Sequence, residues 1–138
     1  MTPQFDRIRD SFARQSFMQT LQVRLAHIEH GRCTLVAPVL PHTTQQHGAG
    51  HAGVTFTLGD VAAGYAALSV MPEGAEVMTA EIKINLLRPA MGETLEATGE
   101  VLKSGRRLIV VRSDVHAIIG AKRTLIATLL GTMVPVDP

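Results

Sequence analysis

The longest apolar stretch of the chain runs from Val54 to Met71 and contains one charged residue, Asp60. It is long enough for a helix of about five turns. Its apolar side chains point in nearly every direction around the helix axis, which is typical of a helix buried on all sides. Pro72, Glu73 and Gly74 end the stretch. We therefore expect a long helix at the centre of the molecule.

Four stretches after this helix alternate between apolar and polar residues with a period of two, which is typical of β-strands. They cover about residues 77–86, 95–101, 107–118 and 124–134. In the first of them, Met78, Ala80, Ile82, Ile84 and Leu86 alternate with Val77, Thr79, Glu81, Lys83 and Asn85. Short turns separate the strands, and short connections favour antiparallel hairpins between consecutive strands.

Two further elements precede the long helix. Residues 3–20 have helical spacing, with Phe5, Ile8 and Phe12 on one face. Residues 32–39 form a short strand, which gives a sheet of five strands to bury one apolar helix. We therefore predict a single α+β domain over residues 1–138, with an antiparallel sheet of about five strands wrapped around one long central helix.

The composition narrows the possible partners. The 138 residues have a net charge of +1 and only 18% of them are charged, against roughly 25% in an average protein. So little charge favours a homo-oligomer that hides part of its surface. The balanced charge and the 4% of aromatic residues argue against nucleic-acid binding. The first ten residues are not a signal peptide, so we expect a cytoplasmic protein with no membrane partner.

Asp60 is the most informative single residue. A buried carboxylate without a partner is costly, or else it takes up a proton. The residues on its side of the helix are all small and are expected to form a groove open to a ligand or a partner's backbone. These residues are Gly53, Thr57, Gly64 and Ala67. Two interpretations remain open: a functional carboxylate, or a structural one that bonds a backbone amide or a buried Arg.

The segment before the helix is rich in glycine. Gly48, Gly50 and Gly53 match the spacing of the dinucleotide-binding fingerprint. That fingerprint needs a strand directly before it and a parallel second strand, and neither is expected here. We therefore reject a dinucleotide site. The free backbone amides at the start of the helix remain suited to an anion or a developing oxyanion.

Metal and thiol chemistry are disfavoured. His42, His47 and His51 lie in the same loop, but the intervening glycines disfavour a helical arrangement of zinc ligands, so we expect capping or solvent-facing histidines and no metal. Cys33 falls on the apolar side of its strand, which favours a core position over a nucleophile. As the only cysteine, it also excludes an internal disulfide.

Basic residues gather at the predicted turns. Arg88 follows the first of the four strands, and Lys103, Arg106 and Arg107 surround Gly105 at the next turn. Single basic residues at turns usually serve solubility. As a set around one groove, they suit a ligand that carries phosphate groups.

Two segments resemble the hotdog-fold acyl-coenzyme A thioesterases, in the branch named for phenylacetate degradation (PaaI-like). HAGVTFTLGDVAAGYAA, from His51 to Ala67, is similar to the central-helix motif of that branch, which has an acidic residue near the middle of the helix. TAEIKINLLRPAMGETLEATGEVLKSGRR, from Thr79 to Arg107, is similar to its strand ending in Leu-Arg-Pro-Ala and its Gly-Arg hairpin. The similarity covers about residues 31–134 and implies a hotdog fold.

The resemblance implies roles for individual residues. Asp60 matches the catalytic carboxylate, which acts as nucleophile or as base for water. Ala52 stands where the family usually has the glycine whose amide polarises the thioester carbonyl, and His51 matches the motif histidine. Gln45 falls where this branch carries Asn and a related branch carries Gln. We expect the substrate to contact a further set: Gly53, Thr57, Gly64, Asn85, Arg88, Lys103, Gly105, Arg106 and Arg107.

The sequence thus predicts an acyl-CoA thioesterase that needs no cofactor beyond the coenzyme A of its substrate. The resemblance further implies a homodimer or homotetramer, in which the carboxylate and the oxyanion amide come from different subunits. The alternative is a non-catalytic acyl-CoA binder or sensor on the same fold. Asp60 discriminates between the two, because a pure binder gains nothing from a buried carboxylate.

Overall fold

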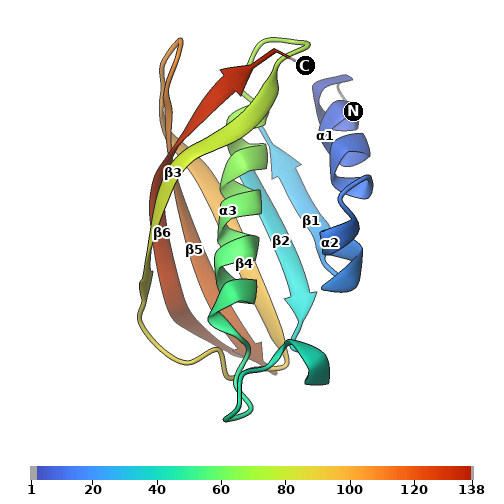
Figure 1. Cartoon of the computed structure of the whole chain (residues 1–138), viewed down its shortest axis with the longest axis vertical. Coiled ribbons are helices and arrows are strands. Elements are labelled where there is room, and N and C mark those ends of the chain that lie inside the picture. Colours follow the sequence, from blue (N-terminus) through green and yellow to red (C-terminus); the bar gives the residue numbers. More distant parts are fainter. Residues whose placement is uncertain (1–2, 138) are drawn as a thin grey trace.

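Six antiparallel strands form one curved sheet that wraps around the long helix α3 (Figure 1). The computed structural model describes residues 3–137, so residues 1, 2 and 138 of the predicted domain lie outside the described residues. The helices are α1 (Pro3–Ala13), α2 (Ser16–Thr20), the 3-10 turn η1 (Pro41–Thr43) and α3 (Ala52–Leu68). The strands are β1 (Arg24–Glu29), β2 (Arg32–Pro38), β3 (Glu76–Leu86), β4 (Thr94–Ser104), β5 (Ile109–Ile119) and β6 (Lys122–Val136). The predicted α+β architecture is confirmed, with six strands in place of five.

The core lies between α3 and the inner face of the sheet. Leu58 of α3 and Leu35, Leu95 and Leu129 of the strands are at most 1% exposed. Gly99 of β4 lets the helix approach closely, because a side chain there would collide with the α3 backbone. Cys33 is fully buried, and burial raises the pKa of its thiol to about 12, so the predicted core position is confirmed.

Strand β1 was not predicted, and a β-bulge explains why. The pairing of β1 with β2 shifts register between Leu25 and His27. As a result, the two side chains of β1 that pack on the core, Leu25 and Ile28, are three residues apart and not two. A bulge changes which residues face inward, so the expected period of two is lost.

The strand order is β1-β2-β4-β5-β6-β3, so only some of the predicted hairpins exist. The β4–β5 and β5–β6 hairpins are confirmed, but a β3–β4 hairpin is wrong, because β3 pairs with β6. The segment 87–93 crosses the end of the sheet instead. Its path is fixed by the Leu87 N–H, which donates to the Ile126 carbonyl (2.8 Å), and by the Ala90 carbonyl, which accepts from the Gly50 N–H (2.9 Å).

The predicted N-terminal helix is two helices, stacked beside β1 and α3 (Figure 1). The break falls at Gln15, whose backbone is extended (φ −81°, ψ 101°). The guanidinium of Arg7 ties α1 to the far end of α3 by donating to the carbonyls of Leu68 and Ala75. The first helices are therefore fixed against the rest of the fold by polar as well as apolar contacts.

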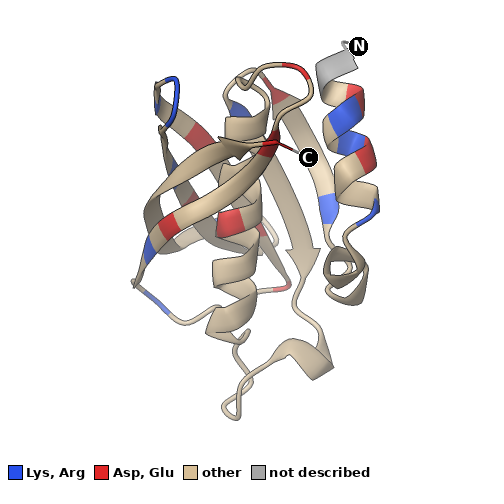
Figure 2. Cartoon of the chain, turned by 45° about the horizontal axis from the view of Figure 1, so that its top comes forward, with Lys and Arg blue, Asp and Glu red and all other residues tan. Residues whose placement is uncertain are grey.

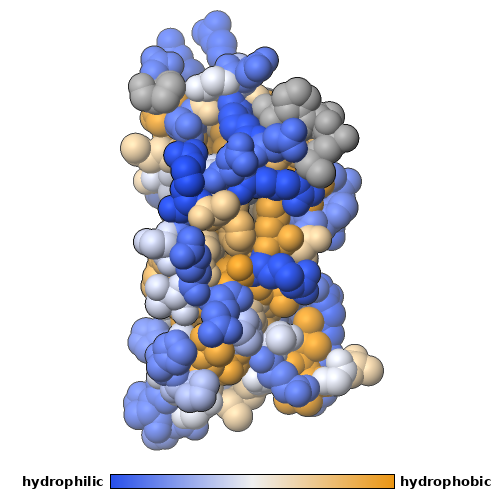
Figure 3. Space-filling view, turned by 90° about the vertical axis from the view of Figure 1, so that its right-hand side faces the viewer, coloured by the Kyte–Doolittle hydropathy of each residue, from blue (hydrophilic) through white to orange (hydrophobic). Residues whose placement is uncertain are grey.

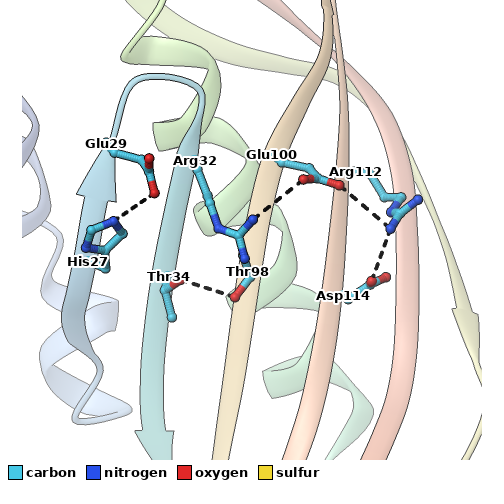
Figure 4. Close-up of polar contacts among 8 residues, drawn as sticks. All are labelled: His27, Glu29, Arg32, Thr34, Thr98, Glu100, Arg112 and Asp114. Atoms are coloured by element: carbon cyan, nitrogen blue, oxygen red, sulfur yellow. Dashed lines mark hydrogen bonds and ion pairs between the residues drawn. The ribbon is translucent and has the colours of Figure 1, made fainter.

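The outer face of the sheet is polar. Figure 4 shows a row of exposed ion pairs across neighbouring strands, in which Glu100 lies between Arg32 (3.9 Å) and Arg112 (3.7 Å). Exposed pairs of this kind contribute at most about 1 kcal/mol each. This face is therefore an ordinary solvated surface, and the functional candidates lie on the helix side.

Helix α3 is not buried on every side within one chain. Residues 62–69 are buried, but in the first half of the helix Ala52, Gly53 and Phe56 are exposed. The expectation of complete burial is therefore wrong for this half, because the sheet covers only one side of it.

None of the helices within residues 3–137 is long and apolar enough to cross a membrane.

Candidate active site

The N-terminus of α3 presents one backbone amide that has no hydrogen-bond partner among residues 3–137. His51 is the N-cap, and its Nδ1 accepts a hydrogen bond from the Gly53 N–H (2.8 Å), which requires Nδ1 to be unprotonated. A side chain at Gly53 would press on the His51 ring, so this cap depends on glycine. The Ala52 N–H makes no hydrogen bond within residues 3–137. It therefore remains available at the positive end of the helix dipole.

Gln45 shapes the loop beside this amide. Its side-chain Oε1 accepts hydrogen bonds from the His47 N–H (2.6 Å) and the Ala49 N–H (3.2 Å), which closes the turn before α3. Its Nε2 makes no hydrogen bond within the described chain. Gln45 and Ala52 line one cleft of about 380 Å³, which we call the Ala52 cleft. Its other lining residues are Ala49, Gly50, Thr55, Leu86, Leu87, Arg88, Pro89 and Ala90.

Asp60 lies in a different cleft, of about 220 Å³, which we call the Asp60 cleft. Its Oδ1 accepts a hydrogen bond from the Thr79 hydroxyl (2.8 Å), and this is the only hydrogen bond of the carboxylate within residues 3–137. The other lining residues are Ser11, Gln15, Val61, Gly64, Tyr65, Glu76 and Val77. The structural alternative, in which a backbone amide or a buried Arg holds Asp60, is therefore not found in the described part of the chain.

Thr79 was not among the predicted site residues, and a second bulge is the reason. The pairing of β3 with β6 shifts register between Thr79 and Glu81. Before the shift Val77 packs on the core and Met78 is 57% exposed, whereas after it Ile82 packs on the core. The simple alternation over 77–86 put Met78 and Ile82 on one face, which is wrong. The bulge turns Thr79 towards α3, and only the structure reveals this.

Two opposing effects act on the carboxyl group of Asp60. Burial raises the pKa of Asp60, because a charged carboxylate is less well solvated there, and the hydrogen bond from Thr79 lowers it. Thr79 thus favours the ionised form at a position where burial disfavours it. This is the protonation state that a nucleophile or a general base requires.

Replacement of Thr79 by Val should raise the pKa of Asp60 further. The substitution removes the hydroxyl donor and keeps the branched shape, so burial acts unopposed. The measurement is a titration of the Asp60 carboxyl carbon by NMR in each variant. Thr79→Ser keeps the hydroxyl and should restore the wild-type titration. Identical titrations of wild type and Thr79→Val would contradict this role.

The remaining predicted site residues are divided between separate places. Gly64 lies in the Asp60 cleft, whereas His51, Gly53 and Thr57 line a third cleft beside α2, with Phe17 and His42. Asn85 is exposed near the end of β3. His42, His47 and His51 do not assemble with other side chains into a set of three possible metal ligands within residues 3–137.

The structure does not bring the predicted basic set together in one chain. Lys103, Gly105, Arg106 and Arg107 belong to the β4–β5 hairpin, whose ribbon is coloured blue for Lys and Arg in Figure 2. Arg88 lies at the opposite end of the sheet, where its N–H donates to the Ile126 carbonyl near the β5–β6 hairpin. A single groove that holds all four basic residues therefore cannot form within one copy of the chain.

Asp60 and Ala52 are also too far apart to act on one atom. They are eight positions apart on α3, which corresponds to about 12 Å along the helix axis at 1.5 Å per residue. Each of them lines a separate cleft. One chain therefore presents two half-sites, a carboxylate and a free amide.

A six-stranded antiparallel sheet wrapped around one long central helix is the hotdog fold. The thioesterase superfamily profile matches residues 47–122, and the chain belongs to this family. A thioesterase family protein from Silicibacter pomeroyi, known from its crystal structure, is 41% identical, with 98% of this chain and 99% of that one covered and a TM-score of 0.95. A presumed esterase of Saccharolobus solfataricus, SSO2140, is 32% identical over 74% of each chain.

The PaaI protein of Escherichia coli, from the phenylacetic acid degradation operon, shares the fold. Its structure has a TM-score of 0.86 and covers 97% of this chain and 94% of its own, at 20% identity. At this level of identity the likeness concerns the fold alone. The family and the esterase-named relative support a hydrolase activity for the protein.

Proposed function

We propose that the protein is an acyl-CoA thioesterase of the PaaI-like branch, which hydrolyses an acyl- or aryl-coenzyme A to the free acid and coenzyme A. The observation that carries this proposal is the state of Asp60, a half-buried carboxylate whose only hydrogen bond within residues 3–137 comes from Thr79. The reaction uses water and no cofactor beyond the coenzyme A of the substrate. We also propose that the protein is located in the cytoplasm.

The chemistry follows from the two half-sites. The thioester carbonyl oxygen accepts a hydrogen bond from the Ala52 N–H, which stabilises the oxyanion that forms during attack. Asp60 either takes a proton from the attacking water or attacks the carbonyl carbon itself. In both routes the carbon–sulfur bond breaks, the sulfur leaves with the electron pair and gains a proton, and the acid keeps an oxygen that originates from water. The proposed role of Gln45 is to orient the substrate near Ala52 through its Nε2, which has no hydrogen bond within residues 3–137.

We propose further that two copies of the chain complete each site. Strand β3 is an edge of the sheet and carries exposed apolar side chains, with Met78 57% and Leu86 56% exposed. Exposed apolar edges of this kind favour pairing with another chain. In Figure 3, apolar surface also runs down the middle of the side that carries α1 and α2. A two-fold dimer through β3 repeats each contact, so Asp60 of one copy can face Ala52 of the partner subunit.

The test is thiol release from a panel of acyl-CoAs, followed with a thiol-reactive dye. A thioesterase releases free coenzyme A with repeated turnover. The alternative, an acyl-CoA binder or sensor, binds the same compounds and releases no thiol. Binding of acyl-CoA without any thiol release across the panel would overturn the proposed function.

The basic hairpin is proposed to hold the phosphates of coenzyme A. Lys103, Arg106 and Arg107 are all exposed and belong to one hairpin, and arginine forms paired hydrogen bonds with phosphate. The double change of Arg106 and Arg107 to Ala should raise KM for acyl-CoA by roughly tenfold, since exposed ion pairs are individually weak. The KM should also become less sensitive to salt, because the lost attraction is screened by ions.

An acyl-pantetheine lacks the nucleotide phosphates and serves as the control substrate for this double change. Its KM should stay the same in the double variant. Equal losses with both substrates would show that the arginines support the fold or an interface instead.

A further inference from the structure

The Asp60 cleft contains a second polar group that the proposed reaction does not use. Tyr65 lies on α3 five residues after Asp60 and is 3% exposed. Its hydroxyl accepts a hydrogen bond from Gln15 Nε2 (2.7 Å) and shares another with Ser11 Oγ (3.0 Å). Its ring packs edge-on against Phe12, with the ring centroids 6.3 Å apart. The N-terminal helices thus bring polar side chains into the same cleft as the carboxylate.

This end of the cleft has both free acceptors and free donors, because the Ser11–Tyr65 pair uses only one of its two hydroxyl hydrogens and Gln15 Nε2 uses one of its two N–H groups within residues 3–137. The Nε2 of Gln15 donates to the Tyr65 hydroxyl, whereas the Oε1 of Gln15 has no hydrogen bond within residues 3–137. Glu76, at the start of β3, lines the same cleft and has no hydrogen bond or ion pair in the described chain. No Lys, Arg or His is among the described residues that line the cleft. A hydroxyl group, which both donates and accepts a hydrogen bond, therefore fits here, whereas the carboxylates of Asp60 and Glu76 repel an anion.

We propose that Gln15, Tyr65 and Glu76 form a specificity site for acyl groups that carry a hydroxyl group at their far end. This inference rests on the proposed thioesterase function and identifies the class of its substrate. Five residues of helix separate Asp60 from Tyr65, or roughly 7 to 8 Å along the axis. With the thioester at Asp60, the hydroxyl then lies about six bonds from the carbonyl carbon. An alkyl end would leave the acceptors desolvated and unpaired.

The preference can be measured with two substrates of the same size. In 6-hydroxyhexanoyl-CoA a hydroxyl group stands where heptanoyl-CoA has its terminal methyl group. For the wild-type protein, kcat/KM should be roughly tenfold higher with the hydroxy compound. Adipoyl-CoA, whose acyl group ends in a carboxylate, should be slower than both, because Glu76 and Asp60 repel it.

Two variants test which residues carry the preference. Gln15→Met keeps the length of the side chain and removes its polar atoms, so the ratio of the two kcat/KM values should fall towards one. Glu76→Gln removes a negative charge on a different element, so the disadvantage of adipoyl-CoA should shrink even if the N-terminal helices are disturbed in the first variant. Gln19→Met is the matched control, because Gln19 is exposed on α2 outside the cleft, and it should leave the ratio unchanged.

The outcomes separate this inference from the function on which it rests. No thiol release from any acyl-CoA by the wild-type protein would overturn the thioesterase itself. An active enzyme with equal kcat/KM for the matched pair, or a preference that both Gln15→Met and Glu76→Gln leave intact, would overturn the specificity site alone.

Discussion

Replacement of Asp60 by Asn should lower the release of thiol from acyl-CoA by at least about 10²-fold, as for the loss of a general base. Asparagine has the size of aspartate and can still accept the hydrogen bond from Thr79, which is 2.8 Å from Oδ1 in the wild-type protein. What it lacks is the negative charge that takes a proton from water or attacks the carbonyl carbon. The measurement is kcat/KM for the best substrate of the acyl-CoA panel.

The matched control is Asp114→Asn. Asp114 accepts a hydrogen bond from the Thr128 hydroxyl at 2.8 Å, the same distance as between Thr79 and Asp60, but it lies on the outer face of the sheet. This control should keep its turnover. Near-normal turnover by Asp60→Asn would contradict the catalytic assignment, and an equal loss in both variants would indicate a general disturbance of the fold.

The Asp60→Asn substitution should also stabilise the folded protein at neutral pH. Burial raises the pKa of Asp60 above its ordinary value, so the folded state binds a proton more readily than the unfolded state. Between the pKa of Asp60 in the unfolded state and its higher pKa in the folded state, the free energy of unfolding therefore falls as the pH rises. Above that pH range the ionised carboxylate destabilises the folded state. Asp60→Asn removes the buried negative charge and with it this destabilisation. Urea unfolding at neutral pH should show a higher free energy of unfolding for the variant, with the difference lost at acid pH.

The sequence allowed the architecture to be predicted where its hydrophobic pattern is regular. The apolar stretch from Val54 onward corresponds to α3, and the alternating stretches correspond to β3, β4, β5 and β6. In β4, where Leu95, Ala97 and Gly99 alternate with polar residues, the predicted inner face is buried as expected. The pattern failed at the bulges of β1 and β3, because one extra residue reverses the face of every residue beyond it.

The site was predictable only in part, for a related reason. Asp60 could be singled out because a lone charge in an apolar helix is a local feature of the sequence, whereas Ala52 was assigned only through its place in the family motif. Thr79 reaches Asp60 only through the bulge of β3, and Gln15 reaches Tyr65 only through the break between α1 and α2. Contacts of this kind join segments that are 19 and 50 residues apart, and no periodicity encodes them.

Replacement of Ala52 by Pro should lower thiol release by roughly 10²- to 10³-fold, the loss seen when one oxyanion donor is removed. Proline has no N–H, and it is favoured at the first position of a helix because its φ is already suitable. It also requires the preceding residue to be extended, and His51 is extended (φ −64°, ψ 138°). Since the Ala52 N–H has no partner within residues 3–137, the melting temperature should change little. Ala52→Gly keeps the amide and should remain active.

The two inactive variants together test whether the site is shared between subunits. If Asp60 of one copy acts with Ala52 of the partner subunit, a mixed dimer of Asp60→Asn and Ala52→Pro chains has one site with both defects and one site with neither. Refolding the two variants together should therefore restore thiol release that neither shows alone. Each variant refolded by itself is the control. A mixture that forms dimers and stays inactive would show that both groups act from the same chain, and the 12 Å separation along α3 would then require α3 to bend or unwind during the reaction.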